Sequence, residues 1–308
     1  MRTTAVLGIL IVTLSFAAVQ PGPMRTLPAA DKIRIVTTVF PLAEFARAVA
    51  EDKGDVSLVL PPGAEVHTWQ PRISDITRIA TADLFIYIGA GLEAWVRDLL
   101  KSAARPGLKT IECVLGVSLM AEDPAEAHHE QEGLDPHIWL DFEIDGMLID
   151  KIRTALTEID PANAARYQRN ATAFQEKLGA LDRDYRDVLK SCGRRVFLYG
   201  GHAAFGYLAR RYGLEQIPIY GPSPDAVPTP KELARIIDRA RKMNISTVFF
   251  EPNLGDKMAR LVANPLRADV RPLNPGHNVT RADIERGVGF LDLMRINLEN
   301  LKHGLGCL

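Results

Sequence analysis

Three of the seven histidines in this sequence stand where their imidazoles could bind one metal ion together. His67 lies in PPGAEVHTWQP, just after an apolar run, His202 follows the apolar run RVFLYGG, and His137 lies in LDPHIWLD. Imidazole suits zinc, copper, iron and nickel, whereas manganese sites depend more on carboxylates. A site built from these three side chains therefore favours Zn²⁺ over Mn²⁺.

The apolar runs before His67 and His202 explain why these two residues should meet. Both runs are rich in β-branched or aromatic residues and are predicted to be buried strands. Ligands of open α/β sheets gather at the carboxyl ends of parallel strands. The two strands belong to different halves of the chain, so the histidines should face one cleft between two lobes. Gly63, Gly200 and Gly201 would allow the backbone to approach closely there.

Carboxylates near these histidines are candidates for a supporting role. A metal-binding imidazole usually donates its other N–H to a carboxylate or a carbonyl, which fixes its tautomer. Glu65, Glu93, Asp141 and Glu251 lie in suitable segments, although each is also compatible with a helix cap or a surface charge. Glu251 is the strongest candidate, because it ends the apolar run STVFF and a carboxylate at the end of a buried strand needs a partner.

The segment around His128 and His129 is acidic and has no apolar periodicity. It could collect metal ions weakly as a flexible loop. A solvated linker is the favoured interpretation, because charged segments of this composition cannot bury a core.

Cys113, Cys192 and Cys307 form no CxxC pair and match no zinc-binding spacing. In an oxidising compartment two of them could form one disulfide, and the sequence leaves the pairing open.

Strands and helices alternate along the first part of the chain. Residues 33–39, 56–60 and 83–88 are predicted strands, with a helix after Pro41 and another that begins after Ser74 as its N-cap. This alternation predicts a parallel sheet with crossover helices.

The same pattern returns after Gly193. A strand over RVFLYG precedes a helix that ends at Gly213, and Thr229 and Glu232 form a capping box for the next helix. STVFFE and DVRPL are further predicted strands, DKMARLVA is a helix between them, and a final helix is expected from about Thr280.

A long helix is predicted between the two halves. Asp160 and Pro161 supply an N-cap and a first-turn proline, and Gly193 is the expected C′ residue. Apolar residues follow at spacings of three and four: Tyr167, Ala171, Phe174, Leu178, Leu181, Tyr185 and Val188. From residue 161 to residue 192 this helix would be about 48 Å long at 1.5 Å per residue. A strut that joins two lobes is favoured over a coiled coil, because α/β patterns flank it on both sides.

The predicted organisation comprises a signal peptide (1–22), an N-terminal α/β lobe (31–142), a helical linker with the long helix (143–192) and a C-terminal α/β lobe (193–308). Residues 1–22 combine a basic start with a short apolar run, which is typical of an export signal; a retained N-terminal anchor is the alternative. The chain has 37 basic and 38 acidic residues and a net charge of −1. This balance argues against a nucleic-acid partner.

Several stretches in the same order resemble the metal-binding, or cluster 9, solute-binding proteins of bacterial ABC transporters for zinc and manganese. They are PPGAEVHTWQPRISD, ADLFIYIGAGLEAWVRDLL, DPHIWLD, GHAAFGYLARRYGL, PSPDAVPTPKELARII and FFEPNLGDK. The resemblance covers essentially the whole chain after the signal. It implies two Rossmann-like α/β lobes joined by one long rigid helix, with the metal between the lobes on His67, His137 and His202.

The resemblance also implies a fourth ligand, an aspartate in a Leu-Asp-Pro stretch. This chain has Leu273-Asn274-Pro275 there instead. Asparagine offers only a neutral carbonyl oxygen. Water, Asn274 and His277 are the candidates in that order, and Glu251 would compensate part of the positive charge.

The resemblance implies a periplasmic, monomeric carrier that captures Zn²⁺ and delivers it to an ABC permease, without enzymatic activity. Two alternatives stay open from the residues alone. A secreted zinc hydrolase would use the open coordination position, with Glu65 or Glu251 as its base, although no HExxH motif is present. A metal-binding adhesin is the other.

Overall fold

Two parallel four-stranded sheets form the framework of the computed structural model, which describes residues 32–121, 133–220 and 227–308. Both sheets have the same relative strand order, with the first strand of each lobe lying between its second and third strands. The two-lobed α/β fold is therefore confirmed. The expected signal peptide and the segment with His128 and His129 lie outside the described residues. The domain boundaries stay a prediction.

The first sheet has the order β2-β1-β3-β4. Its strands are β1 (Ile33–Thr37), β2 (Gly54–Leu58), β3 (Leu84–Tyr87) and β4 (Lys109–Glu112). Helices α1 (Phe40–Ala50), α2 (Ile73–Thr81) and α3 (Val96–Ser102) belong to this lobe. Strand β4 was not predicted, because Ile111 is its only buried residue and four residues with one apolar anchor give little pattern.

The second sheet has the order β6-β5-β7-β8. Its strands are β5 (Val196–Gly200), β6 (Glu215–Pro218), β7 (Thr247–Phe250) and β8 (Asp269–Pro272). Helices α6 (Gly206–Tyr212), α7 (Pro230–Lys242) and α8 (Lys257–Leu266) accompany it. The capping box at Thr229 and the left-handed Gly213 at the end of α6 are confirmed. The edge strand β6 was not predicted.

Two antiparallel helices connect the sheets, α4 (Phe142–Ile159) and α5 (Ala164–Leu189). Helix α4 was not recognised as a separate helix. Asp160 does not cap the long helix as predicted, because it precedes a short 3-10 turn at Pro161–Asn163 that reverses the chain. Helix α5 has 26 residues, which corresponds to about 39 Å. Among the described residues, no helix combines the length and the apolar character that crossing a bilayer requires.

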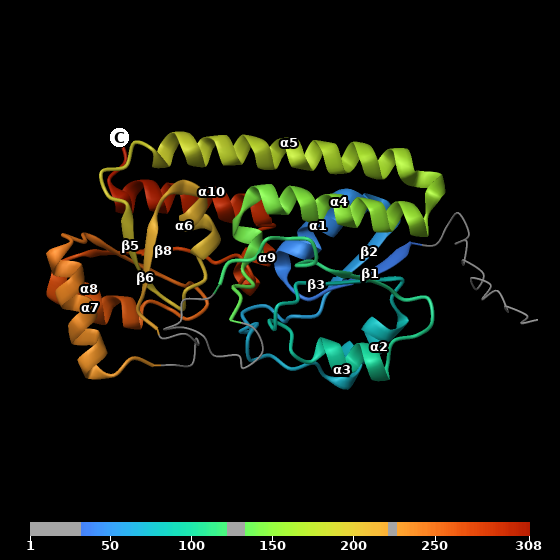
Figure 1. The fold of residues 1–308 in the computed structure, drawn as a ribbon, viewed down its shortest axis with the longest axis horizontal. Helices are drawn as coiled ribbons and strands as arrows, with labels where there is room; N and C mark the ends of the chain where they lie inside the picture. The colour runs from blue at the N-terminus through green and yellow to red at the C-terminus, as the bar shows by residue number, and fades with distance from the viewer. Residues whose placement is uncertain (1–31, 122–132, 221–226) are drawn as a thin grey trace, which may run out of the picture.

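Helix α5 packs against both lobes, as Figure 1 shows along the upper side of the molecule. Most of its predicted apolar stripe is buried, and Phe174 and Val188 are partly buried. Phe174 contacts Phe45 of α1, with ring centroids 5.8 Å apart. The Tyr185 hydroxyl donates to the Met294 carbonyl of α10 (Phe290–Leu305) at 2.6 Å. One apolar core therefore continues from the first lobe into the second.

Two further predicted helix ends were wrong. Helix α2 begins at Ile73, so Ser74 lies inside it, and the Asp75 carboxylate accepts the Arg72 N–H instead (3.0 Å).

The final helix starts as predicted, because Thr280 is the N-cap of α9 (Arg281–Glu285). It is not one helix, however: α9 and α10 are separated at Gly287, whose φ of +67° suits glycine.

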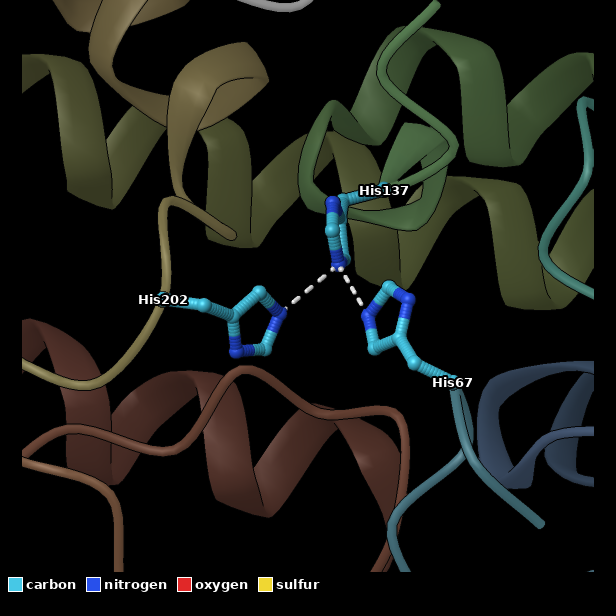
Figure 2. Close-up of side chains that lie close together, drawn as sticks. All are labelled: His67, His137 and His202. Carbon is cyan, nitrogen blue, oxygen red and sulfur yellow. Dashed lines mark hydrogen bonds between the residues drawn. The ribbon is translucent and has the colours of Figure 1, made fainter. Parts of the chain in front are cut away.

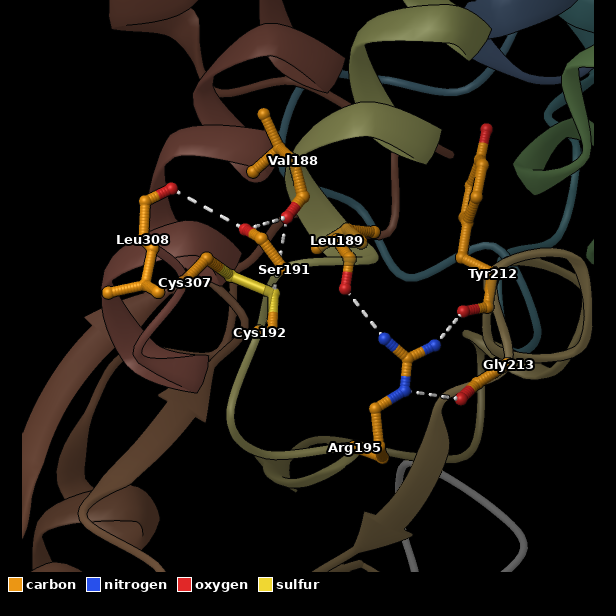
Figure 3. Close-up of a disulfide and its surroundings, with 9 residues drawn as sticks. All are labelled: Val188, Leu189, Ser191, Cys192, Arg195, Tyr212, Gly213, Cys307 and Leu308. Carbon is orange, nitrogen blue, oxygen red and sulfur yellow. Dashed lines mark hydrogen bonds between the residues drawn. A yellow bond between two sulfur atoms is a disulfide. The ribbon is translucent and has the colours of Figure 1, made fainter.

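The second of these wrong ends is Gly193, because α5 ends four residues earlier, at Leu189. The Arg195 guanidinium takes over the role of a cap there: it donates to the Leu189 carbonyl of α5 at 2.6 Å and to the Gly213 carbonyl at the end of α6 at 2.9 Å (Figure 3).

A disulfide between Cys192 and Cys307 resolves the pairing that the sequence left open, and Cys113 is buried and free. It joins the chain just after α5 to the chain just after α10 (Figure 3). Hydrogen bonds from the Gly193 and Arg194 N–H groups to the Gly306 and Leu305 carbonyls run beside it.

Replacing Cys307 by serine should lower the free energy of unfolding by about 2–4 kcal/mol, because the disulfide closes a long loop in the unfolded chain. The two cysteines are 115 positions apart. Thermal unfolding with and without a reductant measures this effect. Reductant should lower the melting temperature of the wild-type protein and leave the Cys307→Ser variant unchanged. Equal sensitivity of both proteins would contradict the assignment.

A second prediction concerns Asp182 of α5, which accepts hydrogen bonds from the Arg211 side chain (2.8 and 2.9 Å) and from the Tyr212 hydroxyl (2.7 Å). Burial opposes the charge of Asp182, but these hydrogen bonds outweigh it and lower its pKa from 3.8 to about 2. Asp182→Asn should therefore reduce stability at neutral pH by about 2 kcal/mol.

The pH dependence of this effect has a defined sign. A carboxyl whose pKa is lower in the folded protein stabilises it above the unfolded pKa and loses this contribution as the pH falls through the folded pKa. The difference between wild type and Asp182→Asn should therefore be full above about pH 4 and shrink towards pH 2. Chemical denaturation across this range measures it, with the exposed Asp184→Asn on the same helix as control. A difference that persists at pH 2 would argue against the ion pair.

Candidate metal centre

His67, His137 and His202 come together between the two lobes from three separate segments (Figure 2). His67 lies in the loop between β2 and α2, and His202 follows β5 directly. His137 comes just before the 3-10 turn Ile138–Leu140 that leads into α4. The two strand-end positions follow from parallel topology, because the loops at the carboxyl ends of β2 and β5 open towards the same space.

The three rings present their Nε2 atoms to one another. The distance from His137 Nε2 is 3.3 Å to His67 Nε2 and 3.1 Å to His202 Nε2. The ring centroids lie 4.8–5.3 Å apart. His137 and His202 are buried, whereas His67 is partly exposed. Of the three histidines, only His67 is therefore in part exposed to solvent.

The tautomer of His137 follows from its neighbour Asp135. His137 Nδ1 lies 2.7 Å from Asp135 Oδ1, which also accepts the His137 backbone N–H at 2.9 Å. An ionised carboxylate can only accept hydrogen bonds, so Nδ1 carries the hydrogen. In the neutral ring Nε2 then keeps a lone pair directed at the other two histidines. Such an arrangement is typical of a metal-binding imidazole held by a carboxylate.

Sequence reasoning did not single out Asp135, because it directly follows the acidic segment around His128 and His129 and has the same composition. The signal was a carboxylate two positions before a candidate ligand. The Asp135 carbonyl also accepts from the Tyr207 hydroxyl of α6 at 3.0 Å, so the second lobe helps to hold the segment that carries His137.

His202 and His277 are both kept neutral by their surroundings. Burial, followed by the nearby His67, His137 and His277, holds the pKa of His202 well below its usual value. Burial also lowers the pKa of His277 to about 3, with a smaller contribution from His137. Neutral imidazole is the form that binds a metal ion.

The expected carboxylates divide into two groups. Glu93 accepts from the Thr38 hydroxyl (2.5 Å) and from the Ile88 and Gly89 N–H groups (both 3.0 Å), so it organises a loop of the first lobe. Asp141 caps α4 by accepting from the Glu143 N–H at 3.0 Å. Asp141 therefore matches the alternative interpretation as a helix cap, whereas Glu93 is a buried carboxyl that is neither a cap nor a surface charge.

Glu65 and Glu251 lie near the histidines instead. Glu251 Oε2 is 3.9 Å from His202 Nδ1, and Glu251 Oε1 is 3.6 Å from His277 Nε2. The Glu65 carboxylate accepts the His67 backbone N–H at 3.2 Å. Burial and the charge of Glu65 raise the pKa of Glu251 to about 8. A side chain at position 201 would place its Cβ 3.2 Å from Glu251 Oε2 and even closer to the Tyr199 ring, so Gly201 permits this packing.

Asn274 is buried, and its side-chain oxygen accepts the Gly276 N–H at 2.8 Å. Its backbone N–H donates to Asn297 Oδ1 at 2.8 Å, and its carbonyl accepts from Asn297 Nδ2 at 2.7 Å. The side chain of Asn274 therefore supports the turn that carries His277.

Asn278 joins the loops of the two lobes, a contact that sequence reasoning did not predict. Its side-chain Nδ2 donates to the Pro61 carbonyl at 2.9 Å and to the Ala64 carbonyl at 2.7 Å, both in the loop that carries His67. The Gly63 N–H donates to the Val279 carbonyl at 3.0 Å. These bonds fix the His67 loop to the segment that follows β8.

Comparisons with known sequences and known structures all lead to the same family. The family model for the periplasmic zinc-uptake complex component A (ZnuA) matches residues 35–304. The high-affinity zinc uptake system protein ZnuA of Bacillus subtilis is 35% identical over 284 residues, which cover 89% of this chain and 88% of that protein. The zinc-binding lipoprotein AdcA of Streptococcus pneumoniae is 34% identical over 281 residues, and this chain spans only 56% of its length.

Solved structures agree with this result. The Zn(II)-bound ZnuA-like domain of Streptococcus pneumoniae AdcA superposes with a TM-score of 0.78 at 32% identity, covering 89% of this chain and 99% of that domain. The laminin-binding protein Lmb of Streptococcus agalactiae, described as an adhesin with metal-transporting activity, has a TM-score of 0.78 at 30% identity over 89% of this chain and 100% of its own.

Asp135→Asn should weaken zinc binding by about 10- to 100-fold. An amide oxygen accepts the Nδ1 hydrogen of His137 less strongly than a carboxylate does, so it fixes the tautomer of that ring less well. Titration against a competing chelator measures the affinity. Asp160→Asn, a change of the same size at the far end of α4, is the control. Unchanged zinc affinity of Asp135→Asn would mean that Asp135 does not orient a ligand.

Proposed function

The chain belongs to the family of the periplasmic zinc-uptake complex component A, and on this premise we propose that it captures one Zn²⁺ with His67, His137 and His202 and delivers it to an ABC permease. The family consists of zinc-binding solute-binding proteins of ABC transporters and not of enzymes. The chain is extracytoplasmic, as its family is.

The convergence of three Nε2 atoms is the observation that carries the choice of ligands. The Nε2 atoms of His67 and His202 lie 3.3 and 3.1 Å from His137 Nε2, so one cation placed among them would have three nitrogen ligands. Three nitrogen ligands with one further position suit the tetrahedral preference of Zn²⁺. The ring of His137, held by Asp135, is already in the orientation that such a site requires.

Water is the proposed fourth ligand. Asn274 supports this choice, because its oxygen already accepts the Gly276 N–H. His277 supports it too, since its ligand atoms group with Glu65 and Glu251 and not with the three histidines. The charge of the three-histidine site would then be balanced in part by Asp135 and Glu251.

The finer points of location and assembly are part of the same proposal. Export to the periplasm through residues 1–22 would place the site where it meets zinc from outside the cytoplasm. A monomer is proposed, because α5 and its partners already bury one continuous core within a single chain. A balanced net charge of −1 gives no reason to expect a nucleic-acid partner.

The proposal is tested by replacing His202 with alanine, which removes one of the three proposed ligands. The two that remain, His67 and His137, both come from the first lobe. Tight zinc binding should be lost while the protein stays folded. Competitive chelator titration gives the affinity, and circular dichroism confirms the fold. His303→Ala, which removes an exposed histidine of α10, is the matched control. Tight binding that survives His202→Ala would disprove the ligand set.

A further inference from the structure

A second group of potential ligands lies beside the three histidines. Glu65, Glu251 and His277 each offer one ligand atom, and these atoms lie within 4.8 Å of one another. Glu251 is 0% exposed and His277 is 1% exposed. Within the described part of the chain, Glu251 Oε1 and both ring nitrogens of His277 have no hydrogen-bond partner. Buried polar atoms of this kind normally have one.

The second group is distinct from the first, although His202 stands between them. His202 directs Nε2 to His137 and lies with Nδ1 on the side of Glu251. The ring centroid of His277 is 6.5 Å from that of His202, farther than any distance within the first group. His277 therefore does not complete the first group in this arrangement.

The buried carboxyl of the second group, Glu251, has no permanently charged partner in the described part of the chain. Glu251 has no lysine or arginine within 4.0 Å among the described residues, and its ion-pair partners are His202 and His277. Glu65 adds a second carboxylate to the same group. A divalent ion bound between them would give Glu251 Oε1 and a His277 nitrogen the partner that buried polar atoms normally have.

From this geometry we propose that Glu65, Glu251 and His277 form a second divalent-metal site next to the three-histidine site. The inference rests on the proposed function, because it assumes that the first ion occupies the three histidines. Two carboxylate oxygens and one imidazole nitrogen are a harder ligand set than three imidazoles, so this site should accept Mn²⁺ as well as Zn²⁺. Two cations on either side of His202 repel each other, so the second ion binds more weakly than the first.

The test counts zinc ions and assigns each to its residues. The full chain is stripped with a chelator, dialysed and titrated with Zn²⁺ by calorimetry, and the bound metal is measured after gel filtration at saturating and at stoichiometric zinc. The wild-type protein should bind one ion tightly and a second more weakly. His277→Ala should weaken the binding of the second ion by at least about 100-fold and leave the affinity for the first ion unchanged. Removing a residue that only orients a ligand would have a smaller effect.

Two further variants keep the result interpretable. Glu251→Gln has nearly the same volume as the wild type, so it guards against a loss of binding through misfolding, and it should also remove the second ion. His303→Ala should retain both ions. Thermal unfolding of each apo-protein establishes that it is folded.

Each other outcome has a defined meaning. A wild-type protein that binds a single ion, with tight binding unaffected by His277→Ala, overturns the second site and leaves the proposed function intact. A single bound ion whose affinity falls in His277→Ala also overturns the second site, because His277 is then the fourth ligand of the three-histidine site. A wild-type protein that binds no zinc overturns both proposals.

Discussion

The arrangement of the whole molecule depends on the apolar face of α5. This one helix buries side chains against α1 in the first lobe and against α10 in the second, so neither lobe has a core that is complete without it. Fixing both sheets to the same rigid element sets their relative position. The loops that follow β2 and β5 then face one another, and the histidines they carry can meet. The metal centre is thus a consequence of how a distant helix packs.

Hydrogen bonds across the cleft reinforce this position close to the histidines. Asn278 of the second lobe holds two carbonyls of the His67 loop, and the Trp139 indole N–H donates to the Pro275 carbonyl at 2.7 Å. Both contacts join segments that carry or precede ligand candidates. A wide opening of the lobes would have to break these bonds, of which the one from Trp139 is buried and those from Asn278 are partly buried. A buried polar group that loses its partner costs more free energy than the bond contributed. The cleft is therefore stiff on two sides, at the long helix and at the loops.

Features with a local pattern could be predicted from the sequence. The apolar stripe of α5, the strands before His67 and His202 and the capping box at Thr229 each leave a signal within a few residues. The edge strands β4 and β6 leave almost none, because only one residue in each is fully buried. Helix ends were unreliable where a side chain from elsewhere replaced the local cap, as Arg195 does at the end of α5. The link from Asn278 to Pro61 spans 217 positions and has no sequence pattern at all.

The pairing of Cys192 with Cys307 has a topological meaning beyond stability. The chain enters the second lobe and leaves it at the same place, where the Gly193 and Arg194 amides meet the last turn of α10. Everything between these two cysteines, including His202 and Glu251, is a closed covalent ring attached to the rest of the protein at one junction. A single backbone cut inside that ring would leave both fragments tethered, so His202 would stay linked to the first lobe even in a nicked molecule.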